Sequence, residues 1–503
     1  MQDNACNAHA LSVTLLFLIP ALGGLLFGYD IGSTAYTVKQ MQNSTLSGIT
    51  WSENASDPVV KGLIVSATSA GAFIGSFIVF AVADTIGRKR ELQTGSLLYL
   101  VGAIFQYFCC NDSLDAIVGI ACLILSRVLY GIGIAFSMHG APTYIAEMSP
   151  PNLRGLLVSM KEAMIVVGIL CGYLIGWVLE DTPRGWAYVY GCSSFLSGIM
   201  FFGTFTIPFS ARWLLLRGRE DEAFLSLQWV FKGDDDNIMD IYKKMKNLVA
   251  SQAEAAVLRG SADKSIFATR WRGALTAGVG LVILQQVTGQ PSILSYATPI
   301  LDDAGLESYS SVLVGAFKLV ATLFSVFYVD NYGRRKLLFI GNGLMLVALV
   351  TLSISFCVDD SDSSTNNSGD IGFKQIVTLV GMFVYIGGYQ VGFGPIAWLM
   401  ISECFPLEIR GQAVAFAVSM NFFWNLVVQF GLPTVQEQIG NASMFIIFST
   451  LTAYSIFFVH KYVPETKGLS LEQIESFFEQ QHRKMAGNNK KTAETPLITS
   501  DFV

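Results

Sequence analysis

The sequence predicts an all-α membrane protein in which twelve transmembrane helices form two six-helix halves, joined by a cytoplasmic helical linker. Composition is the first reason: 52% of the 503 residues are hydrophobic and only 14% are charged, against about 25% charged in an ordinary soluble domain. The second reason is the presence of twelve apolar runs that are long enough to cross a bilayer. The third is an internal repeat that divides the chain into two similar parts.

Each apolar run approaches the length of about 20 residues that a helix needs to cross the hydrocarbon core. The runs contain Gly and Pro and lack the alternation of membrane β-strands, so a β-barrel is disfavoured. The first run is interpreted as a helix rather than a signal peptide, because residues 1–10 contain no Lys or Arg and no small-residue cleavage site follows. The predicted helices begin near Leu11, Val60, Leu92, Ala116, Leu156, Trp186, Gly273, Ser311, Leu337, Ile376, Gln412 and Met444.

A repeated charged motif marks the same point in both halves. Asp-Thr-Ile-Gly-Arg-Lys-Arg at residues 84–90 returns as Asp-Asn-Tyr-Gly-Arg-Arg-Lys at residues 330–336. A second repeated spacing agrees with it, from Glu147 to Arg154 and from Glu403 to Arg410. The repeat predicts a six-helix bundle at 1–209, linker helices at 210–270, a second six-helix bundle at 271–463 and a tail at 464–503.

The distribution of Lys and Arg predicts the orientation in the membrane. Most of these residues fall on one side, which is therefore cytoplasmic and includes both termini and the linker, whereas the other side has little more than Lys39, Lys61, Arg184 and Lys374. Asn-x-Ser/Thr acceptors all fall on that other side, which predicts a glycoprotein that passes through a secretory membrane. The acceptors are Asn43, Asn54, Asn111, Asn366 and Asn441.

The sequence does not indicate an enzyme. The four histidines are scattered, the eight cysteines lack metal-ligand spacing, and no Gly-Lys-Ser/Thr loop is present for ATP. We therefore expect no catalytic residue, no metal, no cofactor and no nucleic-acid partner.

Further motifs match a known family over nearly the whole chain. They are Gly28-Tyr29-Asp30, both Gly-Arg loops, Arg127 with Gly131 and Gly133, residues 142–147, residues 285–289, Gly394-Pro395 with Trp398, and residues 464–468. Together they resemble the sugar porter family of the major facilitator superfamily, which implies the major facilitator fold and transport by alternating access. Residues 138–142, 161–162 and 289–292 are most similar to plant-type vacuolar and plastidic glucose transporters, also called xylose-proton-symporter-like.

A sugar site needs amides that both donate and accept hydrogen bonds, beside aromatic faces that cover the ring. Gln285 and Gln286 fit this role, because they precede Gly289 and Pro291, where the seventh helix is expected to break at mid-membrane. The alternative for these amides is hydrogen bonding between helices. The resemblance adds further residues that line or gate the sugar site, although each also suits packing: Phe27, Tyr296, Trp398 after a break at Gly394-Pro395, Asn421 and Asn425.

Several positions depart from the animal and bacterial relatives. Pro291 stands where an Asn is usual, Phe422 is the aromatic after Asn421, and Glu162 and Lys318 replace neutral amides. A charge within a span costs at least about 2.5 kcal/mol on insertion scales. Glu162 and Lys318 are therefore candidates for the sugar site. Two alternatives remain for them: contact with the ligand, or an ion pair with each other.

Asp30 and Arg127 lie deep in the first and fourth predicted helices, where neither can be buried alone without severe cost. We expect them to pair, and the pair can act as a proton site whose occupancy changes when the two separate. In resembling proton symporters this position is Asp, whereas passive carriers often have Asn. We therefore predict proton-coupled symport of a monosaccharide, a glucose-like hexose or xylose, with a facilitative uniporter and a non-transporting sugar receptor as alternatives.

The repeated loops predict a lock on the cytoplasmic side. Carboxylates and arginines are expected to pair where helix ends of the two halves meet, and these pairs must break before that side opens. A single surface pair contributes about 0 to 1 kcal/mol, so a network is needed; the alternative is that the bases only set orientation. The lock residues are Asp84, Arg88, Glu147, Arg154, Asp330, Arg334, Glu403 and Arg410. A related motif at residues 208–213 lacks its usual acid.

The expected partners are the lipid bilayer, the monosaccharide and protons, with the chain as a monomer. Residues 494–498, Glu-Thr-Pro-Leu-Ile, resemble an acidic dileucine sorting signal and favour a vacuolar membrane, with the plasma membrane as the other candidate. No transit peptide precedes the first helix, which argues against the plastid envelope.

Overall fold

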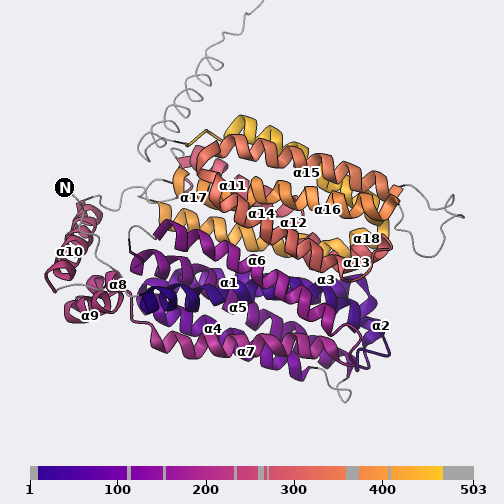
Figure 1. Ribbon diagram of the computed structural model, residues 1–503, viewed down its shortest axis with the longest axis horizontal. Helices are drawn as coiled ribbons and strands as arrows, with labels where there is room; N and C mark the ends of the chain where they lie inside the picture. The colour runs from indigo at the N-terminus through magenta and orange to yellow at the C-terminus, as the bar shows by residue number, and fades with distance from the viewer. Residues whose placement is uncertain are drawn as a thin grey trace, which may run out of the picture.

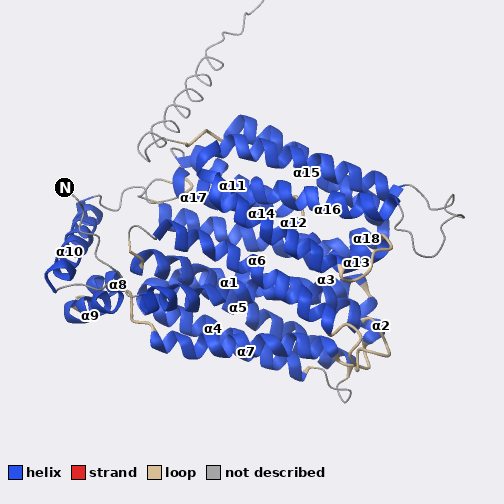
Figure 2. Cartoon of the chain, in the orientation of Figure 1, coloured by secondary structure: helices blue, strands red, loops and turns tan. Residues whose placement is uncertain are grey.

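A computed structural model describes residues 10–109, 115–150, 154–231, 235–258, 266–268, 271–357, 373–405 and 409–467. Every regular element in these ranges is a helix (Figure 2). The long helices run side by side in one bundle, with those of the first half on one flank and most of those of the second half on the other (Figure 1). The predicted all-α class is therefore confirmed.

Six long helices and one short helix form the first half. Helix α3 (Pro58–Ile86) begins with Pro58 in its first turn, and the Asp57 side chain accepts hydrogen bonds from the backbone N atoms of Val59 and Val60. It ends at Gly87, whose φ of 80° is a conformation that glycine adopts at low cost. The elements are α1 (Ala10–Met41), α2 (Ser52–Ser56), α3 (Pro58–Ile86), α4 (Arg88–Phe108), α5 (Ala116–Met148), α6 (Arg154–Val178) and α7 (Gly185–Thr206).

The second half also has six spans, but some are interrupted and two are joined. The seventh span consists of α11 (Arg272–Val287), α12 (Gln290–Ser295) and α13 (Ala297–Asp303), and the tenth consists of α16 (Phe373–Val391) and α17 (Phe393–Cys404). Between them lie α14 (Ser310–Tyr332) and α15 (Arg334–Cys357). The last element, α18 (Arg410–Tyr462), contains two spans that meet at a kink at Gly440. The twelve predicted transmembrane helices are thus confirmed.

The two interruptions differ in how well the sequence located them. The seventh span breaks at Gly289, which has a φ of 92°, and Pro291 follows in the first turn of α12, as expected. The tenth span breaks at Gly392 rather than at Gly394-Pro395. The reason is that Pro395 lies in the first turn of α17, where its missing N–H costs no helical hydrogen bond.

Three helices, α8 (Ala211–Leu216), α9 (Glu220–Val230) and α10 (Asp235–Leu258), lie together at one end of the bundle, which we call the linker end (Figure 1). Glu220 holds α9 to α10, because its Oε2 accepts hydrogen bonds from Lys246 Nζ at 2.7 Å and from the Tyr242 hydroxyl at 2.8 Å. The hydrogen bond from Lys246 lowers the pKa of Glu220.

The outer surface of the bundle is apolar. Phe77, Phe195 and Phe202 are among the large side chains that remain exposed, with exposed fractions of 56%, 71% and 69%. Eight described helices are each long and apolar enough to cross a membrane, and α18 counts among them once although it contains two spans. Side chains of this kind on the outer face are covered by lipid in a bilayer.

The two halves meet mainly along two helix pairs, α3 with α18 and α6 with α14, and α1 also contacts α12 and α13. The first contact is close, because a Cβ added at Gly62 of α3 would lie 2.4 Å from the carbonyl oxygen of Phe430. Small residues at such points let helix backbones approach each other. Polar side chains on α3 and α18 are therefore brought within reach of one another across the boundary between the halves.

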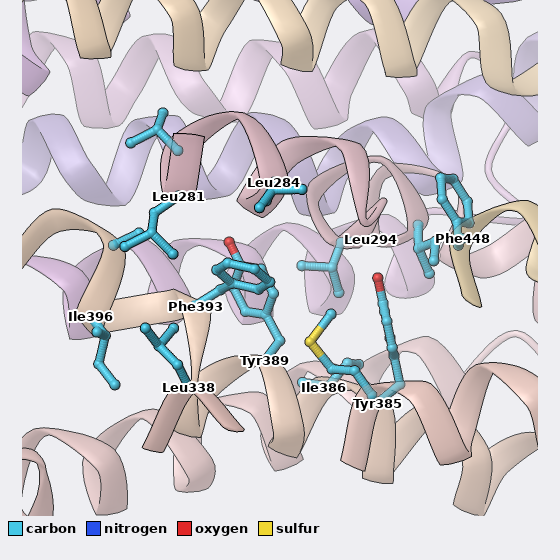
Figure 3. Close-up of a cluster of buried hydrophobic side chains, with 14 of the residues drawn as sticks. Leu281, Leu284, Leu294, Leu338, Tyr385, Ile386, Tyr389, Phe393, Ile396 and Phe448 are labelled. Atoms are coloured by element: carbon cyan, nitrogen blue, oxygen red, sulfur yellow. The ribbon is translucent and has the colours of Figure 1, made fainter. Parts of the chain in front are cut away.

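A buried apolar cluster surrounds the interrupted seventh span (Figure 3). Leucines of α11 and α12 pack there against aromatic side chains of α16 and α17, including Tyr389 and Phe393. The break frees backbone carbonyl groups, and tyrosines satisfy two of them: Tyr385 donates to Thr288 O and Tyr173 to Leu294 O, each at 2.7 Å. Such partners allow a non-helical segment to persist at membrane depth.

Candidate functional site

Asp30 of α1 and Arg127 of α5 form a buried ion pair inside the first half. Arg127 Nη1 lies 3.2 Å from Asp30 Oδ1, and Arg127 Nη2 lies 3.3 Å from Oδ2. Arg127 has no exposed surface and Asp30 is 6% exposed. The guanidinium also donates to the Tyr190 hydroxyl at 2.6 Å and to Thr34 Oγ1 at 3.1 Å. The arginine therefore keeps hydrogen-bond partners that do not depend on the carboxylate.

A cluster of buried amides lies where α11 of the second half meets α18. Asn421 donates to Gln285 Oε1 at 3.4 Å, and Asn425 donates to Gln286 Oε1 at 2.8 Å. Gln285 also donates to the Phe393 carbonyl oxygen at 3.0 Å, beside the interruption of the tenth span. The four predicted amides are thus brought together, and they bond one another in two pairs.

Two further polar residues join this cluster, although the sequence did not single them out. Ser69 Oγ of α3 lies 2.7 Å from Asn425 Oδ1 and 2.7 Å from Gln429 Oε1. Gln429 Nε2 in turn donates to Ser295 Oγ at 3.4 Å. A clue for Gln429 is its position four residues after Asn425, on the same face of α18. Nothing in the sequence points to Ser69.

The predicted aromatic residues occupy different environments. Phe27 of α1 meets Phe422 of α18 edge to face, with 6.4 Å between the ring centres, and so closes one wall between the halves. Tyr296 is fully buried and donates to the Gln429 carbonyl oxygen at 3.1 Å. Trp398, by contrast, is 38% exposed on α17. Phe27 and Tyr296 therefore lie beside the polar cluster, whereas Trp398 retains a partly open surface in this conformation.

A small cavity joins the ion pair to the amide cluster. Its volume is about 10 Å³, close to the space that one water molecule occupies. Its wall includes Asp30 and Arg127 on one side and Ser69, Asn425 and Gln429 on the other. A monosaccharide does not fit this volume.

Lys318 and Glu162 lie on either side of the α6–α14 contact. Lys318 is 4% exposed; its Nζ donates to Gln390 Oε1 at 2.9 Å and lies 5.3 Å from the centre of the Tyr389 ring. The Glu162 carboxylate interacts electrostatically with Lys318, but in the described part of the chain no direct ion pair joins the two. The expected mutual attraction is therefore present at longer range, and the direct partner of Lys318 is a neutral amide.

The first-half members of the predicted lock form a network at the linker end. Arg88 lies 3.0 Å from Asp84 Oδ1 through Nη2 and 3.6 Å from Glu147 Oε1 through Nε. Glu147 Oε2 accepts a hydrogen bond from Ser210 at 2.5 Å. Ser210 belongs to the motif that lacks its usual acid, so a hydroxyl donor there contributes to the network instead.

In the second half, Arg334 at the start of α15 has the place that Arg88 has at the start of α4. Arg334 Nη2 lies 3.2 Å from Glu403 Oε1, and Thr466 donates to Glu403 Oε2 at 2.5 Å. Glu465, which sequence reasoning did not assign to the lock, accepts hydrogen bonds from the backbone N atoms of Arg334 at 2.9 Å and Arg335 at 3.2 Å.

These contacts differ from the expected lock in one respect. In the portion of the chain that the structure describes, each ion pair of the repeated loops connects helices of a single half, rather than helices of different halves. The cause is the repeat itself, because each loop meets the acidic helix end of its own half. The side chains of Arg154, Asp330 and Arg410 lie outside the described residues.

An ion pair that does cross between the halves lies at the opposite end of the bundle. Lys39, at the end of α1, has its Nζ 2.6 Å from Asp302 Oδ2 of α13 and 2.7 Å from Glu180 Oε1 after α6. Ser308 accepts from the same ammonium at 2.9 Å. The sequence placed Lys39 on the outer side but gave no sign of its partners, which are far away along the chain. Among the described residues, no three His, Cys, Asp or Glu side chains converge as a metal site.

Comparison with known proteins identifies the family. A family model described as Sugar (and other) transporter matches residues 16–478. The D-xylose-proton symporter-like 3, chloroplastic, of Arabidopsis thaliana is 39% identical over 485 residues, which cover 92% of this chain and 82% of that protein. The D-xylose transporter of Levilactobacillus brevis is 30% identical over 469 residues, covering 92% and 95%.

A solved structure is similar over nearly its whole length. The inward open conformation of the xylose transporter XylE from E. coli has a TM-score of 0.72 and 26% sequence identity, and the match covers 92% of this chain and 99% of that one. The matched family model, the relatives and the twelve-helix bundle agree with the motifs quoted above. The chain belongs to the sugar porter family of the major facilitator superfamily.

Proposed function

We propose that this chain is a proton-coupled symporter of a monosaccharide, a glucose-like hexose or xylose, that works by alternating access. One observation carries the proposal: a single cavity between the halves has both the Asp30–Arg127 pair and the amide Asn425 in its wall. Coupled transport needs a proton site and a sugar-binding site, each of which changes the affinity of the other for its ligand. The names of the relatives, D-xylose-proton symporter-like and D-xylose transporter, support this substrate class.

Asp30 binds the coupled proton in this proposal. Its carboxylate is held by two Arg127 nitrogen atoms, at 3.2 and 3.3 Å, and protonation removes the charge that this contact satisfies. Arg127 remains held by Tyr190 and Thr34 when the contact weakens. The proton therefore changes how tightly α1 is joined to α5 without leaving an unpartnered arginine.

The sugar binds at the amide cluster. Gln285, Gln286, Asn421 and Asn425 now satisfy one another, and sugar hydroxyls can replace these bonds because an amide offers both a donor and an acceptor. The Phe27 and Phe422 rings supply an apolar surface for a ring face. Lys318 and Glu162 stand beyond Tyr389 and Gln390, where they set the charge balance of the site rather than its direct contacts.

Alternating access opens one end of the bundle at a time. The linker end faces the cytoplasm in our proposal, with both chain termini on that side, and the lock residues stiffen each half there. The Lys39–Asp302 contact closes the outer end in this conformation. We also propose the division into a first bundle at 1–209, a linker at 210–270, a second bundle at 271–463 and a tail, in a vacuolar or plasma membrane.

The proposal is tested with purified protein in liposomes. Uptake of labelled glucose, xylose and other hexoses and pentoses is measured with and without an imposed proton gradient. We expect accumulation of a hexose or xylose above equilibrium only when the gradient is present. Equilibration without accumulation would make the protein a uniporter, and binding without flux would make it a receptor.

A further inference from the structure

Two adjacent residues of α3 contact two different sites. Thr68 Oγ1 accepts a hydrogen bond from Arg127 Nη2 at 3.4 Å, beside the Asp30 carboxylate. Ser69 Oγ lies 2.7 Å from both Asn425 Oδ1 and Gln429 Oε1 of α18. The Thr68 contact lies within the first half, whereas the Ser69 contacts cross to the second half, and all of these residues line the same cavity. One turn of α3 thus connects the charged pair with the amide cluster.

The Ser69 hydroxyl has one hydrogen atom and two amide oxygens at equal distance. Because a hydroxyl has one hydrogen atom to donate, Ser69 makes a full hydrogen bond with Asn425 or with Gln429 at any moment, and not with both. Both Ser69 and Gln429 are buried, with exposed fractions of 7% and 5%. The amide oxygen that Ser69 leaves is therefore shielded from bulk water and available to a ligand hydroxyl.

Gln429 connects this choice to the interrupted seventh span. Its side chain donates to Ser295 Oγ of α12 at 3.4 Å, and its backbone oxygen accepts from Tyr296 at 3.1 Å. When Ser69 changes its acceptor from Asn425 to Gln429, the hydrogen bond between the halves is transferred to a side chain that also contacts Ser295 of α12. This is the segment just beyond the left-handed Gly289, where the span can bend.

We propose that Ser69 is a positioning residue that couples sugar binding at Asn425 to the Asp30–Arg127 pair, with Gln429 as its alternative acceptor. The inference rests on the proposed function. A sugar hydroxyl that donates to Asn425 Oδ1 displaces the Ser69 hydroxyl, which turns to Gln429. The resulting shift of α3 against α18 acts on Arg127 through the neighbouring Thr68, and so alters the contact of Arg127 with Asp30.

Other titratable groups near the pair are tyrosines, which ionise near pH 10 in their unperturbed form. They come from four helices of the first half and from the junction of α12 and α13, and they do not exchange protons near neutral pH. They are Tyr29 of α1, Tyr99 of α4, Tyr130 of α5, Tyr190 of α7, and Tyr296 at the junction of α12 and α13. A pH effect transmitted by Ser69 is therefore assigned to Asp30.

A matched control lies on the same two helices. Ser76 Oγ of α3 lies 3.0 Å from Ser419 Oγ of α18, so Ser76→Ala also removes a hydroxyl contact between the halves. Ser76 does not line the cavity that contains Asp30 and Asn425. A merely structural role for Ser69 predicts equal behaviour of Ser69→Ala and Ser76→Ala.

The experiment compares wild type, Ser69→Ala, Ser69→Thr and Ser76→Ala in liposomes. The KM for sugar is measured with the outer side acidic and then alkaline. A coupling free energy of ordinary size changes affinity by about tenfold, so we expect about this change in wild type, Ser69→Thr and Ser76→Ala. We expect less than about a twofold change in Ser69→Ala, whose KM becomes nearly independent of pH.

The outcomes separate the inference from the proposed function. A Ser69→Ala protein with the pH-dependent KM of wild type overturns the inference alone. So does an equal loss of pH dependence in Ser69→Ala and Ser76→Ala. A wild-type protein whose KM and accumulation ignore the proton gradient overturns the proposed function, and the inference with it.

Discussion

Lys39 of α1 and Asp302 of α13 join the two halves through a contact of 2.6 Å between Nζ and Oδ2. Glu180 and Ser308 accept from the same ammonium, at 2.7 and 2.9 Å. One cation thus holds groups of both halves at the end opposite the linker. The corresponding networks at the linker end, on Arg88 and Arg334, stay within single halves. Among the described residues, the direct ion pair between the halves therefore lies at the end opposite the linker.

Replacement of Lys39 by Met should favour opening at that end. Each partly exposed ion pair contributes about 0 to 1 kcal/mol, so the ratio of outward-open to closed protein should rise by roughly two- to fivefold. Accessibility of a cysteine reporter placed in the outer cavity measures this ratio. The exposed pair Lys246–Glu220 provides a control, because Lys246→Met removes a pair of similar length far from the boundary. Unchanged accessibility in Lys39→Met, or recovery failing in a Lys39→Asp, Asp302→Lys swap, would count against the closure.

Glu465→Ala should destabilise the second half. The Glu465 carboxylate accepts from the first two backbone N atoms of α15, at 2.9 and 3.2 Å, and so caps that helix from a distant part of the chain. Loss of a helix cap costs about 0.5 to 2 kcal/mol. The apparent unfolding temperature in detergent should fall. Glu222→Ala, which breaks the exposed pair with Arg219, should leave it nearly unchanged; equal falls for the two variants would refute the capping role.

Gly289→Ala should impair both stability and transport. Gly289 has a φ of 92°, and a Cβ there would lie 2.6 Å from the Phe448 ring. Alanine at a positive φ costs about 1 kcal/mol or more before any clash is counted. Gly343→Ala is the control, since nothing lies within 4 Å of a Cβ at that helical position. Wild-type uptake and melting in Gly289→Ala would show that the break does not need this backbone geometry.

Lys318→Gln and Glu162→Gln should each impair transport more than the double substitution does. Glu162→Gln leaves the buried Lys318 charge without its long-range counterpart, Lys318→Gln does the same to the half-buried Glu162, and the double change restores balance. The expected coupling in a double-mutant cycle is about 0.5 to 3 kcal/mol, read from kcat/KM. Strictly additive losses would mean that the two charges act independently, and the case for a shared charge balance would fall.

The sequence predicted the helices well because long apolar runs have one stable form in a bilayer. The predicted start positions of the helices lie close to the observed ones; at Ala116, where α5 begins, the two coincide. The prediction was wrong where the backbone conformation of a single residue determines the position of a break. The tenth span breaks at Gly392, which has no proline beside it, rather than at Gly394-Pro395. A helix tolerates Pro395 in its first turn, so the proline was a poor guide to the break.

The candidate site was predictable only in part. Tandem amides before a helix breaker identified Gln285 and Gln286, and the cost of a lone buried charge identified Asp30 with Arg127. Ser69 and Lys39 were missed for another reason. Their partners lie on the other half of the chain, so no local spacing shows the contact, and a single Ser or Lys has many ordinary uses. Contacts between the halves need the fold itself.

The central claim is that the Asp30 carboxylate carries the proton that moves with the sugar, and its most direct test is sugar-induced proton flux in liposomes. Sugar is added on one side of a membrane without a pH gradient, and the internal pH is followed with a trapped dye. We predict proton entry with sugar in the wild-type protein and none with Asp30→Asn, which should still exchange labelled sugar because the amide cluster is intact. Sugar-induced proton entry through Asp30→Asn at the wild-type rate would contradict the account.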